Sequence, residues 1–180
     1  MTNYLVVTAM GDDRPGIVSQ LAKVASDCDC DIVDSRMAIF GNEFTLIMML
    51  SGAWSAITLL ETSLSSVSME LGLLTVMKRT SKHTPQNFMS RIEVNFEGKN
   101  QRGTMRQITE FLASQSLDLA AVRSHAEENS NAEQIQSVYF AINIPENADL
   151  NALEQGIHDL ANTMSLNCRI KLMLNTALID

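Results

Sequence analysis

The chain repeats its own residue pattern once. Gly11 recurs as Gly98 at an offset of 87 residues, and in the last third of each copy the offset is 93 residues, which aligns Leu60 with Leu153. The difference implies six extra residues in the second copy, which we place in the polar stretch 126–136. Further matches at the first offset are Gly16 with Gly103, Leu21 with Ile108, Asp31 with Asp118 and Arg36 with Arg123. The 180 residues are therefore predicted to form two copies of one small domain.

Each copy predicts the same order of elements. In the first copy, an apolar strand over residues 4–9 precedes a helix that starts at Pro15, a residue favoured at the first helical position, and ends near Asp27. Two apolar runs flank the turn at residues 41–43 and predict a hairpin. The hairpin strands cover residues 32–40 and 44–50, and a helix over 54–71 and a strand over 73–78 follow. The second copy repeats this order over residues 91–97, 104–115, 117–126, 138–144, 149–165 and 169–174.

The element order βαββαβ predicts the fold class. Because a hairpin lies between the two helices, a continuous parallel sheet is excluded. The order is that of the ferredoxin-like α+β fold, a four-stranded antiparallel sheet with two helices on one face. We expect two such domains in tandem, at residues 1–80 and 89–180, joined by a polar linker at 81–88 that contains a proline. The sheet face without helices must be polar or must find a partner.

The charge balance limits the partners of the chain. Against 13 Lys and Arg stand 21 Asp and Glu, which gives a formal net charge of −8. A chain this acidic repels the phosphate backbone, so direct nucleic-acid binding is not expected. The longest apolar run, residues 46–50, is far too short to span a bilayer, and the N-terminus lacks the features of a signal peptide. Together with three cysteines, which cannot all pair, these features predict a cytoplasmic chain with free thiols and no membrane contact.

The turn after the first strand, residues 11–17, is the first candidate ligand site. It reads Gly-Asp-Asp-Arg-Pro-Gly-Ile at the expected N-terminus of a helix. The first N–H groups of a helix lack internal partners and carry partial positive charge, which suits a carboxylate. Glycine leaves the backbone accessible, and the aspartates can accept hydrogen bonds from an ammonium group. The turn therefore fits a zwitterionic amino acid, with the candidate binding residues Asp12, Asp13, Arg14, Pro15, Gly16 and Ile17. Residues of these types also form turns and helix starts, so a purely structural role stays open.

The corresponding turn of the second copy, residues 98–104, departs from this pattern. Asn100 replaces Asp13, and Arg102 replaces Pro15. Arg102 and Arg106 lie near a helix N-terminus, where a cation is unfavourable. An anionic ligand, the nearby Glu110 or solvation by water can each compensate for this unfavourable positive charge. The candidate binding residues of this turn are Asn100, Gln101, Arg102, Gly103 and Thr104.

Other motifs give no catalytic or metal site. The spacing of Cys28 and Cys30 is not that of a zinc motif, so residues 27–31 are interpreted as an acidic turn at a helix end. The three histidines are scattered, and no nucleotide-binding or hydrolase fingerprint is present. Ferredoxin-like folds can host acylphosphatase chemistry, for which Asn100 and Arg102 are of suitable types, but the first copy has no equivalent asparagine. We therefore expect no enzyme activity, no metal and no cofactor.

The segment Gly-Asp-Asp-Arg-Pro-Gly-Ile-Val at residues 11–18, followed by an amphipathic helix and a hairpin, resembles the start of an ACT domain. ACT domains are ferredoxin-like regulatory modules that commonly bind amino acids. The resemblance extends over both copies. Two such modules with nothing else attached resemble the glycine cleavage system transcriptional repressor family.

The resemblance to this family implies a function. It implies a non-enzymatic regulator that binds a small amino acid, with glycine favoured, and represses the glycine cleavage operon through contact with a LysR-type transcriptional activator. Glycine is expected to oppose that repression. A stand-alone amino-acid-binding module that regulates a metabolic enzyme is the alternative, and a homodimer is compatible with either function.

Overall fold

The computed structural model describes residues 2–81, 90–145 and 147–174. The chain divides into two compact units, residues 1–84 and 85–180. Each unit has its own sheet and its own hydrophobic core. Apart from Ser81, the linker expected at residues 81–88 lies outside the described residues.

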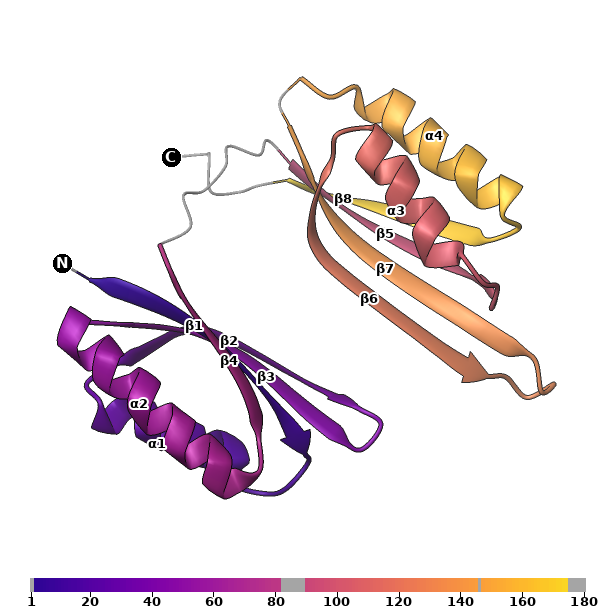
Figure 1. The fold of residues 1–180 in the computed structure, drawn as a ribbon. Helices are drawn as coiled ribbons and strands as arrows, with labels where there is room; N and C mark the ends of the chain where they lie inside the picture. Colours follow the sequence, from indigo (N-terminus) through magenta and orange to yellow (C-terminus); the bar gives the residue numbers. More distant parts are fainter. Residues whose placement is uncertain (1, 82–89, 146, 175–180) are drawn as a thin grey trace. The chain divides into compact units, whose positions relative to one another are not determined.

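Both units have the element order predicted from the sequence (Figure 1). The first unit consists of β1 (Asn3–Asp12), α1 (Ile17–Asp27), β2 (Asp31–Phe40), β3 (Glu43–Gly52), α2 (Trp54–Leu71) and β4 (Leu74–Thr80). The second unit consists of β5 (Ser90–Lys99), α3 (Thr104–Ser114), β6 (Asp118–Glu128), β7 (Gln134–Ile144), α4 (Leu150–Thr163) and β8 (Asn167–Leu174).

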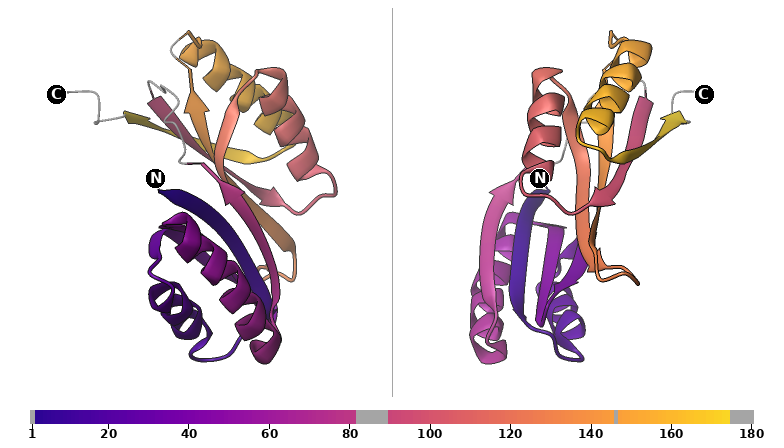
Figure 2. Two further views of the ribbon diagram at one scale, coloured as in Figure 1. Left: turned by 60° about the vertical axis from the view of Figure 1, so that its left-hand side comes forward. Right: turned by 90° about the vertical axis from the view of Figure 1, so that its right-hand side faces the viewer.

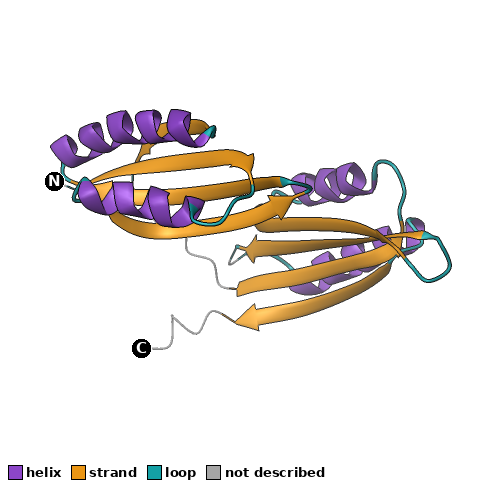
Figure 3. Cartoon of the chain, turned by 90° about the horizontal axis from the view of Figure 1, so that it is seen from below, coloured by secondary structure: helices purple, strands orange, loops and turns teal. Residues whose placement is uncertain are grey.

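Each unit is a four-stranded antiparallel sheet with its helices on one face (Figures 2 and 3). The strand order is β2-β3-β1-β4 in the first unit and β6-β7-β5-β8 in the second. The first strand of each unit, β1 or β5, pairs with the second strand of the hairpin on one side and with the last strand of the unit on the other. The predicted α+β fold, two ferredoxin-like units in tandem, is confirmed.

The two cores follow from strand alternation and helix periodicity. Along β1, Leu5, Val7 and Ala9 are buried, while the residues between them are partly exposed. This alternation packs one face of the sheet against the apolar stripe of α1 and α2. In the second unit, the rings of Phe96 and Phe140 meet edge to face with centroids 6.2 Å apart. Each hydrophobic core is therefore formed by residues of a single unit.

Several predicted element boundaries are wrong. Pro15 is not helical, because Gly16 has a φ of 91°, which lies outside the α-helical region, and α1 begins only at Ile17. The strands are also longer than the apolar runs. β1 continues to Asp12, which pairs with Glu43, because hydrogen bonding between strands does not require apolar side chains.

The insertion in the second copy lies partly in the strands. β6 extends to Glu128 and β7 begins at Gln134, which leaves residues 129–133 as the hairpin loop. The first unit connects the equivalent strands through Gly41 and Asn42 alone. The extra residues thus lengthen the second hairpin as well as its loop.

Candidate functional site

The first turn connects the end of β1 to the start of α1 and is held from two sides. The backbone N–H of Asp13 donates to the carbonyl oxygen of Asn42, at the tip of the β2–β3 hairpin, over 3.2 Å. The guanidinium of Arg14 donates to the carbonyl oxygen of Leu71 at the C-terminal end of α2, where the helix dipole favours a cation. Asn42 and Leu71 therefore position the turn, although neither carries a sequence signal for this role.

The N-terminus of α1 has no side-chain cap. Gly16 occupies the N-cap position with φ 91° and ψ −8°, and its carbonyl oxygen accepts the N–H of Gln20 at 3.0 Å. The first turn of the helix contains no acidic residue, so its partial positive charge is not neutralised there. The exposed carboxylates of Asp12 and Asp13 accept no hydrogen bond from the residues that the structure describes. One short segment thus offers helix N–H donors and free carboxylates.

Two of the predicted binding residues use their side chains elsewhere. The side chain of Ile17 is buried in the core, so only its backbone can face a ligand. Arg14 is bound to the end of α2, as described above. Pro15 and Gly16 are exposed beside the two aspartates. A ligand at this turn is therefore contacted mainly by Asp12, Asp13 and the backbone around Gly16.

The two glycines of this turn are required for different reasons. A Cβ built on Gly16 meets nothing within 4 Å, so its positive φ, not a lack of space, favours glycine. A Cβ on Gly11 would lie 2.8 Å from Cδ2 of Leu73 and 3.3 Å from the carbonyl oxygen of Gly72. The same two constraints occur in the second unit. Gly103 has a positive φ of 87°, and a Cβ built on Gly98 would lie 2.6 Å from Cδ2 of Leu166. The repeated glycines therefore reflect a shared backbone geometry.

The second turn has the same backbone conformation as the first but different side chains. The backbone N–H of Asn100 donates to the carbonyl oxygen of Gln134 over 2.8 Å, which matches the bond of Asp13 to Asn42. Gly103 is the N-cap of α3, again without a side-chain cap. Thr104 is buried, and its hydroxyl donates to the carbonyl oxygen of Gln101 over 3.0 Å. The exposed side chains of Asn100, Gln101 and Arg102 provide two amides and a guanidinium rather than two carboxylates.

The arginines beside the second turn differ in their partners. Arg106 forms an ion pair with Glu110, whose Oε1 lies 2.8 Å from the arginine Nε, one helical turn further along α3. Arg102 is exposed and has no ion pair among the described residues. Glu110 therefore compensates the charge of Arg106 near this N-terminus, while Arg102 stays available to solvent or ligand.

Cys28 and Cys30 are part of the first core. Both are buried, and the Cys28 thiol lies 3.7 Å from the hydroxyl of Ser63. Burial raises the pKa of the Cys30 thiol, and it raises the pKa of Cys168 to about 11. The described residues contain no group of three or more His, Cys, Asp or Glu side chains arranged to hold a metal ion. All three cysteines are free thiols, and the first two act as packing groups of the core.

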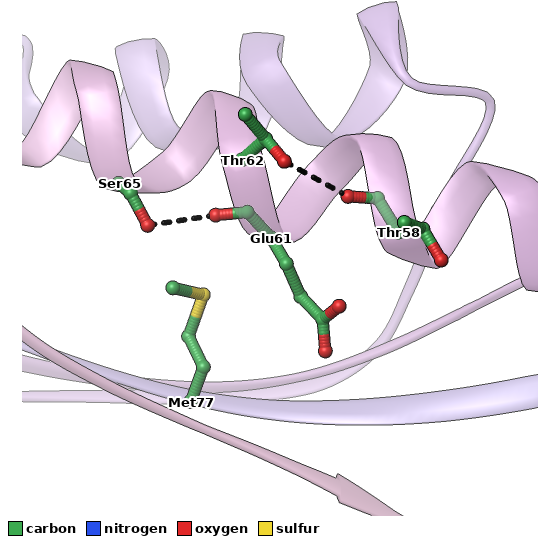
Figure 4. Close-up of a pocket in the computed structure, with 5 residues that line it drawn as sticks. All are labelled: Thr58, Glu61, Thr62, Ser65 and Met77. Carbon is green, nitrogen blue, oxygen red and sulfur yellow. Dashed lines mark hydrogen bonds between the residues drawn. The ribbon is translucent and has the colours of Figure 1, made fainter.

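A hollow of about 470 Å³ lies between α2 and β4 and is lined by Thr58, Glu61, Thr62, Ser65 and Met77 (Figure 4). The hydroxyls of Thr62 and Ser65 donate to backbone carbonyl oxygens of α2. Arg79 binds the Glu61 carboxylate at 2.8 and 2.9 Å and thereby lowers the pKa of Glu61. These polar groups are satisfied within the chain, and no predicted binding residue lines this hollow. The candidate ligand site is thus the exposed turn, not this cavity.

No helix in the described part of the chain is long and apolar enough to cross a membrane.

Comparisons with known proteins place the chain in a family. Residues 3–78 match the family model of the ACT domain. Over 165 residues, the chain is 36% identical to the glycine cleavage system transcriptional repressor of Escherichia coli (strain K12), an alignment that covers 91% of this chain and 86% of that protein. The protein of the same name from Shigella flexneri matches to the same extent.

Solved structures agree with this assignment. A crystal structure described as that of a glycine cleavage system transcriptional repressor is 32% identical, covers 97% of this chain and 99% of its own, and superposes with a TM-score of 0.77. A protein from Galdieria sulphuraria has the same TM-score at 17% identity, which shows a shared fold alone. The resemblance expected from the first turn is confirmed, and the chain belongs to the glycine cleavage system transcriptional repressor family, with an ACT domain as its first unit.

Proposed function

We propose that this chain is a non-enzymatic, amino-acid-responsive regulator of transcription that acts in the cytoplasm. It binds a small amino acid, with glycine favoured, and represses the glycine cleavage operon by contacting a LysR-type transcriptional activator. Glycine relieves the repression. The observation that carries the proposal is the 36% identity to a glycine cleavage system transcriptional repressor over 91% of the chain, which includes both units.

The proposed amino-acid site is the first turn. The carboxylate of the ligand accepts hydrogen bonds from the uncapped N-terminus of α1, and its ammonium group donates to Asp12 and Asp13. In the second turn Asn100 stands where Asp13 does in the first, so an amide oxygen replaces a negative charge. The second turn, with Gln101, Arg102, Gly103 and Thr104, is therefore the poorer acceptor for an ammonium group.

The regulatory effect is proposed to pass through a protein surface rather than through DNA. The formal net charge of −8 opposes contact with the phosphate backbone. A repressor of this kind needs a partner that holds the DNA, and a LysR-type activator supplies that contact.

Calorimetric titration of the intact chain tests the amino-acid part of the proposal. We expect saturable binding of glycine or of another small amino acid, because the turn offers donors for a carboxylate and acceptors for an ammonium group. Acetate and methylamine, which each carry only one of the two charges, serve as controls and should bind more weakly. The absence of binding for glycine, alanine and serine alike would show that the turn has only a structural role.

A further inference from the structure

The two sheets differ on the face that carries no helix. In the first sheet, Val6 and Thr8 alternate with the buried residues of β1 and so lie on this face. The strand register adds Ile47, which is 47% exposed, and Val76, which is 63% exposed. Met10 and Leu74 form the next pair along the same face, and both are exposed. The open face of the first sheet is therefore largely apolar.

Two adjacent rows of side chains cross the middle of this open face. The strand register places Arg36, Ile47, Thr8 and Val76 in one row, in the strand order β2, β3, β1, β4. The register places Asp34, Met49, Val6 and Lys78 in the next row. A hollow of about 240 Å³ lies between the β2 ends of the two rows and is lined by six residues: Val6, Asp34, Ser35, Arg36, Ile47 and Met49.

The equivalent face of the second sheet satisfies its own polar groups. The guanidinium of Arg123 lies 4.4 Å from the centre of the Tyr139 ring, and the Tyr139 hydroxyl donates to Glu93 over 3.0 Å. The row that matches Arg36, Ile47, Thr8 and Val76 consists of Arg123, Tyr139, Asn95 and Arg169. The row that matches Asp34, Met49, Val6 and Lys78 consists of Ala121, Ala141, Glu93 and Lys171. The positions of Ile47 and Val6 are thus taken by a tyrosine and a glutamate that bind each other.

We infer that the open face of the first sheet is the surface through which two copies of this chain form a symmetric dimer. A two-fold axis that lies between the two stacked sheets, parallel to the rows and level with Ser35, exchanges the two rows. Arg36 then faces Asp34 of the second copy, and Asp34 faces its Arg36. Between them, Ile47 meets Met49 of the second copy, and Thr8 meets its Val6. In a two-fold interface every such contact occurs twice, so the β2 side of the face is complementary to itself in charge and its middle is complementary in hydrophobicity.

The charged pair explains why a second copy fits this face. Within one chain, Arg36 and Asp34 lie 3.5 Å apart and are well exposed, an arrangement that adds little stability. Two sheets that stack face to face lie about 10 Å apart and exclude water between them. Each charge then needs an opposite charge, because an unpaired buried charge is strongly unfavourable. The two-fold arrangement supplies two such pairs.

The same symmetry operation does not suit the second sheet. It would place Arg169 opposite Lys171 of the second copy, which are like charges, and Arg123 opposite Ala121. In the first sheet the corresponding contact joins Val76 and Lys78 on the edge strand β4, where the long lysine side chain keeps its charged end in solvent, so no like charges meet. The inference rests on the register and charges of the first sheet and is independent of the proposed amino-acid site.

Analytical ultracentrifugation of the intact chain tests the dimer. We expect the wild-type chain to sediment as a dimer at micromolar concentration. Each single reversal, Arg36→Asp or Asp34→Arg, places like charges together across the interface and should raise the dimer dissociation constant at least about 30-fold. The double variant Asp34→Arg/Arg36→Asp exchanges the two charges, recreates both pairs and should restore dimerisation.

The matched control is Arg169→Asp, the same substitution on the open face of the second sheet, which should leave the dimer intact. Far-UV circular dichroism checks that each variant is folded. A wild-type chain that stays monomeric, a single reversal that leaves the dimer unchanged, or a double variant that fails to restore it would each overturn the inference. Loss of the dimer in Arg169→Asp would also overturn it, because that result would place the interface elsewhere.

Discussion

Replacing Gly16 with leucine is expected to lower the affinity for glycine about 100-fold or more. The leucine side chain would cover the N-terminus of α1 and remove at least two charge-assisted hydrogen bonds to the ligand carboxylate, each of which contributes about 1.5–3 kcal/mol. The variant should still fold. Leucine at a φ of 91° costs about 1–2 kcal/mol, and a Cβ at this position meets nothing within 4 Å. Calorimetric titration measures the affinity, and far-UV circular dichroism checks the fold.

The matched control for this substitution is Gly103→Leu in the second turn. Gly103 has nearly the same φ, 87°, so the backbone strain of the two variants is similar. Gly103→Leu should leave the affinity of the first turn unchanged, and a decrease in stoichiometry would show that the second turn binds as well. Wild-type affinity and stoichiometry in Gly16→Leu would exclude the first turn as the binding site.

Replacing Phe140 with alanine is expected to destabilise the second unit by about 3–5 kcal/mol. Phe140 is fully buried and packs edge to face against Phe96, so the substitution removes a large apolar side chain and leaves a cavity. Urea denaturation followed by circular dichroism measures the free energy of unfolding.

The same substitution at an exposed aromatic residue provides the comparison. Phe40 is 67% exposed at the end of β2, so Phe40→Ala should change the free energy of unfolding by no more than about 0.5 kcal/mol. Equal losses in the two variants would contradict the position of Phe140 in the core.

The sequence is sufficient to predict the element order because alternation and helical spacing record which residues face the core. In β1, buried Leu5, Val7 and Ala9 alternate with less buried neighbours, as the hydropathy pattern predicts. The ends of the elements depend on other forces. The pairing of Asp12 with Glu43 and the positive φ of Gly16 are set by backbone geometry, which hydropathy does not report.

The candidate site is predictable only in part. The aspartates and glycines of the first turn stand out in the sequence, because their chemistry is local. The bond from Arg14 to Leu71 joins residues 57 positions apart, and it depends on how the end of α2 meets the turn. The contrast between the two open faces is likewise hidden until the strand register aligns residues of four strands in one row.

The proposed regulation sets a thermodynamic condition. Glycine can relieve repression only if it binds the free chain more tightly than the chain in complex with the activator. The activator must then weaken glycine binding by the same factor, because the two equilibria are linked. A partner that left the glycine affinity unchanged would be inconsistent with relief by glycine.

An electrophoretic mobility-shift assay with the LysR-type activator on its operator tests the central claim most directly. The chain alone, with its net charge of −8, should not retard operator DNA at physiological salt. Added to the activator–DNA complex, it should change the mobility or the stability of that complex, and glycine should reverse the change. Specific retardation of DNA by the chain alone at nanomolar concentration, or an activator complex unaffected by the chain, would contradict repression through a protein partner.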